Sequence, residues 1–233
     1  MKRSEINAHM RDALAFLEEH RFYLPPFAYW TPEQWRGKGP EAAEIVENQL
    51  GWDITDFGSG DFARVGLFLF TVRNGHPRNL ESRGGKLYAE KIMIVREGQV
   101  TPMHFHWHKM EDIINRGGGN LVIQLYNSSP DGAELLPTEV SVSMDGVRHV
   151  VPAGSSVTLH PGESITLTPG LYHQFQGEPG HGTVLVGEVS LVNDDASDNR
   201  FHQPVGRFPT IEEDEPPLHL LGKDYAAYYG RQG

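Results

Sequence analysis

Cysteine is absent from the 233-residue chain. Its absence excludes disulfides and thiolate chemistry, and it is what we expect of a cytoplasmic protein. Long apolar runs are missing too, since no stretch is long enough to cross a bilayer. The basic start of the chain is not followed by the apolar region of a secretory signal. We therefore expect neither a membrane partner nor export.

Positive charge is also scarce. The chain has 20 lysines and arginines against 31 acidic residues, which gives a net charge of −11. Such a surface repels phosphate backbones, so we expect no nucleic-acid partner. A neutral or cationic small molecule is easier for it to accept. Hydrophobic residues make up 38% of the chain, which is enough for a core of ordinary size.

The first 60 residues have the patterns of helices. An apolar stripe with a 3.6-residue period predicts a helix over 5–20, capped by Ser4. Thr31-Pro32-Glu33 reads as the start of a short helix, and a third helix is expected near 41–48. None of these segments has an obvious chemical motif. We expect them to pack on a sheet or to form a subunit contact.

From residue 63 onward the pattern changes to short strands. They are rich in β-branched and aromatic residues and are separated by glycine, proline or a hairpin turn such as Asp145-Gly146. Many short strands at this spacing indicate a sandwich or a barrel. We expect one domain, with residues 1–60 as a helical extension and 61–233 as the β part with a C-terminal loop and tail. The acidic run 212–215 is expected to be a solvated face.

Histidines alternate at His104, His106 and His108, and Glu111 follows. Residues i and i+2 of a strand point to the same face, so two imidazoles can meet a carboxylate that returns after a short loop. Such a group can bind a first-row divalent metal, although three surface histidines are the alternative interpretation. Farther along, a strand and a Pro-Gly turn lead to His173, which we predict as the fourth ligand. His108 is left outside this set.

Charged residues in apolar surroundings are candidates for proton transfer. Lys91 and Glu188 each lie in an otherwise apolar strand, where an unpaired charge costs several kcal/mol. Lys109 lies beside the predicted metal loop, and it is either an exposed loop residue or a substrate-binding one. Asp198 and Arg200 can hydrogen-bond a polyol or orient Glu188, or they form a solvated pair.

The two histidine-containing stretches resemble the two motifs of the cupin family. Positions of the motifs are occupied by Gly98, His104, His106, Glu111, Gly118, Gly162, Gly170 and His173. Thr168 and Gly177 replace a proline and an asparagine of the second motif, at positions that shape turns. The resemblance implies a mainly β fold, a jelly-roll β-barrel with an N-terminal helical extension.

A narrower resemblance covers nearly the whole chain. LPPFAYW, YAEKIMIVREGQVTPMHFHWHKMEDIINRGGGN, HPGESITLTPGLYH and VGEVSLVNDD look like segments of the D-lyxose ketol-isomerases. The resemblance implies a manganese-dependent aldose–ketose isomerase, usually a homodimer, that interconverts D-lyxose with D-xylulose and D-mannose with D-fructose. It places the metal on His104, His106, Glu111 and His173. Lys91, Glu188, Asp198 and Arg200 match the family's other active-site residues.

Several other functions remain open on the sequence alone. An iron dioxygenase or a decarboxylase can use the same three histidines and one glutamate, because these ligands accept several divalent metals. A sugar-binding module and a storage protein are further alternatives, although neither requires a charged group such as Glu188 near a metal. Among isomerases, a phosphorylated sugar is the second candidate substrate. No cluster of arginine and lysine suits a phosphate.

Overall fold

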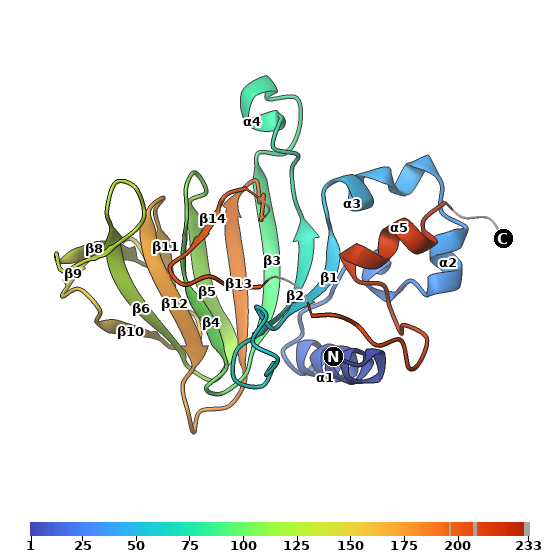
Figure 1. Ribbon diagram of the computed structural model, residues 1–233, viewed down its shortest axis with the longest axis horizontal. Coiled ribbons are helices and arrows are strands. Elements are labelled where there is room, and N and C mark those ends of the chain that lie inside the picture. The colour runs from blue at the N-terminus through green and yellow to red at the C-terminus, as the bar shows by residue number, and fades with distance from the viewer. Residues whose placement is uncertain (196, 207–208, 231–233) are drawn as a thin grey trace.

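The computed structural model describes residues 1–195, 197–206 and 209–230. Helices dominate the first 50 residues (Figure 1). They are α1 (Arg3–Glu19), a 3₁₀ turn (Pro26–Tyr29), α2 (Pro32–Arg36), a second 3₁₀ turn (Pro40–Ala42) and α3 (Ala43–Glu47), and later come α4 (Asn79–Ser82), a third 3₁₀ turn (Gly222–Asp224) and α5 (Tyr225–Tyr228). None of the described helices is long and apolar enough to span a membrane.

Local sequence predicts the first helices, but the predicted Ser4 cap is wrong, because α1 begins at Arg3 with Lys2 at the N-cap position. The apolar stripe of α1 is buried, and Ile6 and Met10 are fully inaccessible to solvent. At the start of α2, the Thr31 hydroxyl accepts from the backbone N–H of Gln34, whose side chain accepts in turn from the Thr31 N–H. Two backbone donors that a helix leaves unpaired are thereby satisfied, as in a capping box.

The rest of the chain is mainly β, which confirms the predicted fold class. The strands are β1 (Gly51–Thr55), β2 (Leu67–Arg73), β3 (Tyr88–Val95), β4 (Val100–His106), β5 (Glu111–Gly118), β6 (Leu121–Ser128), β7 (Leu135–Leu136), β8 (Val140–Met144), β9 (Val147–Val151), β10 (Ser156–Leu159), β11 (Ser164–Leu167), β12 (Leu171–Gly177), β13 (Val184–Leu191) and β14 (Asn199–Phe201). Asp145 and Gly146 both have positive φ and join β8 to β9, as a tight hairpin turn requires.

Two antiparallel sheets face each other. One has the strand order β1-β2-β3-β13-β5-β11-β8-β9 and the other β10-β6-β12-β4-β14, with β7 paired to β6. A core of aliphatic side chains, among them Leu121, Ile123 and Val186, fills the space between them. A second apolar cluster lies where α1 packs against β1, β2 and β3. Figure 1 shows α1, α2, α3 and α5 gathered at this end of the molecule, whereas α4 lies apart, beyond the ends of β2 and β3.

The division of the chain at residue 60 stays a prediction. β1 lies within the first 60 residues, yet it pairs with β2 along its whole length.

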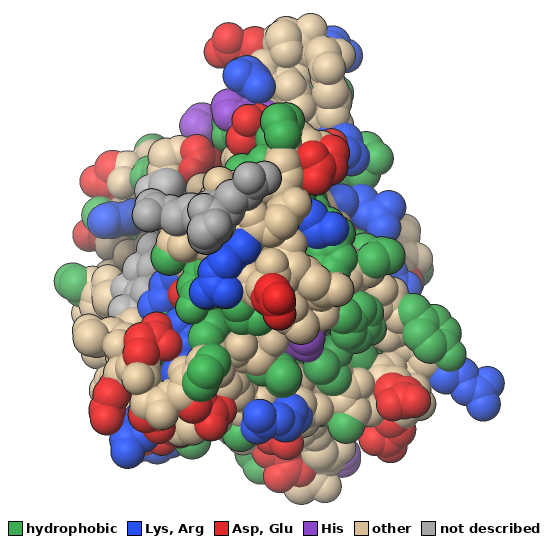
Figure 2. Space-filling model, turned by 90° about the vertical axis from the view of Figure 1, so that its right-hand side faces the viewer, with side chains coloured by type: hydrophobic (Ala, Val, Ile, Leu, Met, Phe, Trp, Pro, Cys, Tyr) green, Lys and Arg blue, Asp and Glu red, His purple; other side chains and the backbone are tan. Residues whose placement is uncertain are grey.

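Figure 2 shows the face on which the helices lie, where acidic, basic and apolar side chains are interspersed.

A bulge in β4 changes which of its side chains face the interior of the barrel. His173 of β12 is paired with His104 of β4, but Phe175 is paired with Thr101. Two steps along β12 therefore correspond to three along β4, so β4 contains one extra residue. Such a bulge breaks the strict alternation of a strand and re-aims side chains. As a result, Thr101 and His104 line the same cavity although they are three residues apart.

The C-terminal segment returns to the start of α1. Arg3 is 2% exposed, and its guanidinium binds the carboxylates of Glu213 and Asp224. Ser4 donates to Asp214 through both its backbone N–H and its hydroxyl. The acidic run is exposed, as expected of a solvated face, but it also ties the two ends of the chain together.

Candidate active site

A cavity of about 290 Å³ lies inside the barrel. Both sheets contribute to its wall, and residues of β1, β2 and β14 complete it. One part of the wall is polar and contains His104, His106, Lys91, Lys109, Glu111 and Glu188. The other part is apolar and includes Met93, Ile113 and Phe175. The polar groups at this site therefore lie in surroundings that exclude most bulk water.

Three histidines form a possible metal site beside this wall, and two of them, His104 and His106, line the cavity. His104, His106 and His173 each offer a ring nitrogen, and these nitrogens lie within 4.8 Å of one another. The Oε1 atom of Glu111 lies 3.3 Å from Nε2 of His106 and 3.2 Å from Nε2 of His173. All four side chains are buried. The structure thus brings together the four residues predicted as ligands.

The hydrogen bonds of the rings suit a metal. Nδ1 of His104 donates to the carbonyl of Pro102 at 2.7 Å, and Nδ1 of His173 donates to that of Leu171 at 3.0 Å. A carbonyl can only accept, so in the neutral rings each Nε2 keeps a lone pair. Nε2 of His173 is buried and has no hydrogen-bond partner among the described residues. A divalent ion would satisfy this atom, so the residues present fit a metal.

Burial and neighbouring charges keep three of the candidate ligands in the forms that bind metal. It lowers the pKa of His104 well below its usual range, and the neighbouring His173 and His106 lower it further. Burial and the ammonium of Lys109 lower the pKa of His106. For Glu111, burial opposes ionisation, but Lys109 and His106 hold its pKa well below the usual value. Near neutral pH His104 and His106 are therefore neutral imidazoles and Glu111 is an ionised carboxylate.

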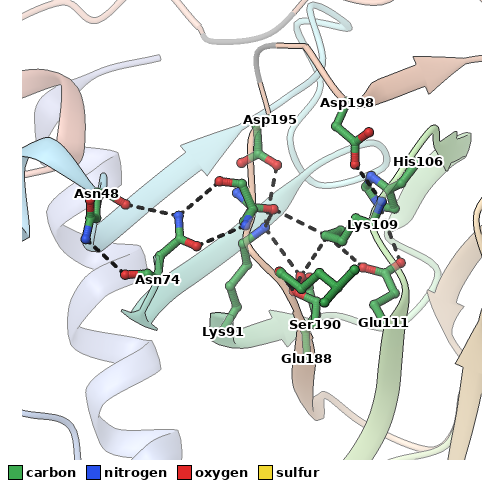
Figure 3. Close-up of polar contacts among 12 residues, drawn as sticks. Asn48, Asn74, Lys91, His106, Lys109, Glu111, Glu188, Ser190, Asp195 and Asp198 are labelled. Atoms are coloured by element: carbon green, nitrogen blue, oxygen red, sulfur yellow. Dashed lines mark hydrogen bonds and ion pairs between the residues drawn. The ribbon is translucent and has the colours of Figure 1, made fainter. Parts of the chain in front are cut away.

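Lys109 bridges two carboxylates. Its Nζ lies 2.7 Å from Oε2 of Glu111 and 2.8 Å from Oε1 of Glu188, and 3.3 Å from Oδ1 of Asn193 (Figure 3). Burial disfavours the ammonium, but the two carboxylates raise the pKa of Lys109 above its usual value. The three N–H groups of this ammonium thus have three acceptors. Lys109 is buried and is not an exposed loop residue.

Lys91 approaches Glu188 from the neighbouring strand. The two residues are paired across β3 and β13. Nζ of Lys91 lies 2.6 Å from Oδ1 of Asn193, and at the longer distance of 3.6 Å from both Glu188 and Asp195. Ser190 also donates its hydroxyl to Oε1 of Glu188, at 3.1 Å. Two lysines and a hydroxyl therefore surround this carboxylate at the cavity wall.

The side chains of Asp198 and Arg200 bond to backbone groups and not to Glu188. The carboxylate of Asp198 accepts from the backbone N–H groups of His108 and Lys109, at 2.8 and 3.0 Å. It therefore holds the loop that presents Lys109. Arg200 is exposed, and its Nε donates to the carbonyl of Gly132 at 3.3 Å. The side chain of His108 is exposed as well.

Sequence reasoning missed three residues of the site. Asn193 contacts both lysines, Asp195 pairs with Lys91, and the ring of Phe201 stacks on His104 with centroids 5.2 Å apart. Asn193 and Asp195 belong to a polar run that resembles an ordinary loop. The available signal was their position directly after the strand that carries Glu188.

Comparisons with known proteins show which family the chain belongs to. The model of a family described as D-lyxose isomerase matches residues 1–225. The D-lyxose/D-mannose isomerase of Serratia proteamaculans is 53% identical over 98% of this chain and 99% of its own. That of Escherichia coli O157:H7 is 50% identical, over 98% and 100%. Among solved structures, L-ribose isomerase of Cellulomonas parahominis aligns with a TM-score of 0.60 and 17% identity, over 91% of this chain and 98% of that one. This last likeness shows a shared fold, the cupin barrel.

Proposed function

Because the chain belongs to the D-lyxose isomerase family, we propose that it is a metal-dependent aldose–ketose isomerase. Its proposed substrates are D-lyxose and D-mannose, which it would convert to D-xylulose and D-fructose. One observation carries this proposal. Three of the four candidate ligands, His104, His106 and Glu111, line a single cavity inside the barrel together with the Glu188 carboxylate and its two lysines.

His104, His106, Glu111 and His173 would hold the ion. When bound, a divalent ion supplies a Lewis acid for the sugar oxygens at C1 and C2. Imidazole and carboxylate ligands accept several first-row metals, so the ligand set alone does not select one. We propose Mn²⁺ because of the resemblance to the family.

Glu188 is proposed as the base that moves the proton. It takes the proton from C2 of the open-chain aldose and returns it to C1, while a proton reaches O1 and another leaves O2. The intermediate is a cis-enediol, and the product is the ketose. The pairing of Glu188 with two ammonium groups supports this role, since it holds the carboxylate in a fixed position at the cavity wall.

The two lysines have different capacities to contact a sugar. Lys109 already has three acceptors for its three N–H groups, so it serves to connect Glu111 and Glu188. Lys91 has one close acceptor, in Asn193, and two longer ion pairs. It can therefore turn an N–H group toward an oxygen on which negative charge develops.

The cavity favours an unphosphorylated sugar. Among the described residues that line it, the cations are Lys91 and Lys109, and both are already paired with carboxylates. A phosphate would add negative charge beside Glu111, Glu188 and Asp195. A volume of about 290 Å³ lies at the small end of ligand pockets, which suits a single monosaccharide.

The test is to incubate EDTA-stripped protein with D-lyxose, with and without Mn²⁺, and to measure D-xylulose. We expect ketose only when metal is present. Protein with demonstrably bound metal that makes no ketose from D-lyxose or D-mannose would overturn the proposal. Oxygen consumption would then test for a dioxygenase.

Assembly as a cytoplasmic homodimer also stays a prediction, and light scattering would test the dimer.

A further inference from the structure

Asn193 lies two residues beyond the end of β13, in contact with the two lysines that line the cavity. Its Oδ1 is 2.6 Å from Nζ of Lys91 and 3.3 Å from Nζ of Lys109. One amide oxygen therefore accepts from both of the lysines that surround Glu188. An ammonium group bonded to a fixed acceptor loses much of its freedom to move, because its long, flexible stem is then tied at both ends.

Asn193 is itself held by another asparagine. Asn74 is 4% exposed and follows the last residue of β2. Its Oδ1 accepts from the backbone N–H of Asn193 at 2.9 Å, and its Nδ2 donates to the backbone carbonyl of Asn193 at 3.0 Å. A single side-chain amide thus satisfies both backbone groups of Asn193, as a neighbouring strand would.

The chain of contacts continues to the helical end of the molecule. Nδ2 of Asn74 also donates to the carbonyl of Asn48, and Nδ2 of Asn48 donates to the carbonyl of Asn74, at 3.2 and 3.1 Å. Asn48 is the residue that follows α3. Figure 3 shows Asn74 between Asn48 and Lys91. Asn193 is therefore fixed from a part of the fold that does not touch the cavity.

The neutral charge of the amide matters at this position. Two ammonium groups already face three carboxylates, those of Glu111, Glu188 and Asp195. An amide oxygen accepts hydrogen bonds without adding a fourth negative charge that would compete with Glu188 for the lysines. An apolar side chain of the same shape would leave the ammonium of Lys91 with only its two contacts at 3.6 Å.

From these contacts we propose that Asn193, held by Asn74, is a positioning residue for the isomerisation. It keeps the ammonium of Lys91 available to the substrate oxygen while Lys109 bridges the two glutamates. Without it, the Lys91 ammonium moves onto Glu188 or Asp195 and no longer donates to the substrate. This inference rests on the proposed isomerase function.

The first experiment compares Asn193→Leu with Asn193→Asp. Leucine has nearly the shape of asparagine but no acceptor, whereas aspartate keeps an acceptor oxygen and adds charge. For Asn193→Leu we expect kcat to fall roughly 10- to 100-fold, the usual effect of removing a partner that orients a reacting group. KM and bound metal should change little, and Asn193→Asp should recover part of the lost kcat.

A second pair of variants separates positioning from stability. Asn74→Ala removes both bonds to the Asn193 backbone. Asn115→Ala is the matched control, because Asn115 is fully buried, donates to two carbonyls and accepts one backbone N–H outside the cavity. Both variants should lower the melting temperature, but only Asn74→Ala should lower kcat of the folded protein.

Chemical labelling reads the position of the lysines without turnover. Lys91 is 5% exposed, so acetic anhydride should acetylate it slowly in the wild type. Mass spectrometry should find slower acetylation of Lys91 in Asn193→Leu and in Asn74→Ala, because a closer ion pair with Glu188 or Asp195 disfavours the free amine that reacts. The rate should be unchanged in Asn115→Ala. The inference is overturned if labelling is unchanged, or if kcat of Asn193→Leu stays near that of an active wild type. A wild type that makes no ketose refutes the proposed function instead, and labelling still decides whether Asn193 positions Lys91.

Discussion

Replacing Arg3 by methionine should destabilise the whole domain, although Arg3 lies far from the cavity. Its guanidinium makes four hydrogen bonds, two to Glu213 at 2.7 and 2.8 Å and two to Asp224 at 2.9 and 3.0 Å. Methionine has a similar length and no charge. The substitution therefore removes the ion pairs while it keeps most of the apolar contact.

The two carboxylates contribute unequally to the expected loss. The side chain of Glu213 is 56% exposed, so water solvates it when Arg3 is gone and the lost pair costs at most about 1 kcal/mol. The side chain of Asp224 is 10% exposed and would be left as a buried charge. Removing one partner of a buried pair costs about 3–5 kcal/mol. We therefore expect a loss of about 3–4 kcal/mol in the free energy of unfolding, and at about 2–4 °C per kcal/mol a melting temperature about 10 °C lower.

Urea denaturation followed by circular dichroism measures this loss. Arg11→Met is the control, since Arg11 is exposed on the same helix and its replacement should change stability by less than about 0.5 kcal/mol. Adding Asp224→Asn to Arg3→Met removes the stranded charge and should recover part of the stability. An Arg3→Met protein within about 1 kcal/mol of the wild type would refute the reasoning, because Asp224 would then not be a desolvated partner.

Three other predictions concern single groups. Glu188→Gln should lower kcat by about 10²- to 10⁴-fold with bound metal unchanged, because it removes the proposed base, and steady-state kinetics with metal analysis would check this. Thr101→Val should raise the free energy of unfolding by about 1 kcal/mol, because the Thr101 hydroxyl is buried without a partner among the described residues, and a lower urea midpoint would contradict it. Hydrogen bonds from the start of α1 lower the pKa of Glu213 and of Asp214 below their ordinary 4.5 and 3.8. The stability that these two carboxylates add is therefore complete above the ordinary values and is lost as pH falls through the lower folded-state values. Urea midpoints measured between pH 3 and 7 would show this loss.

Short-range spacing was sufficient to predict most of the architecture and the grouping of the candidate ligands. The alternation of His104 and His106 depends only on β4 being a strand, and Glu111 begins the next strand after a short loop. The number and spacing of short strands indicated a sandwich or a barrel, and the resemblance to the cupin motifs implied the barrel. Local rules of this kind operate over a few residues, so a sequence can display them directly. The role of these residues as ligands remains a prediction.

Features that depend on distant contacts were not predictable in the same way. Lys109 is buried because Asp198, 89 residues away, holds its loop. Asn193 contacts the lysines because Asn74, 119 residues away, fixes its backbone. The bulge in β4 changes which residues face inward, so strict alternation from His104 would have placed Thr101 on the outer face. Each of these facts needs the register of paired strands, which one sequence does not contain.

The ring that stacks on His104, that of Phe201, follows all four candidate ligands in the sequence, so the order of synthesis affects when the site is complete. The ribosome releases the chain from its N-terminus, and the four candidate ligands are complete once His173 has emerged. Phe201 is synthesised later, as part of the last strand. A chain interrupted between these two points therefore carries every candidate ligand but lacks the ring that covers His104. Biosynthesis in this order supplies the metal-binding groups first and encloses them afterwards.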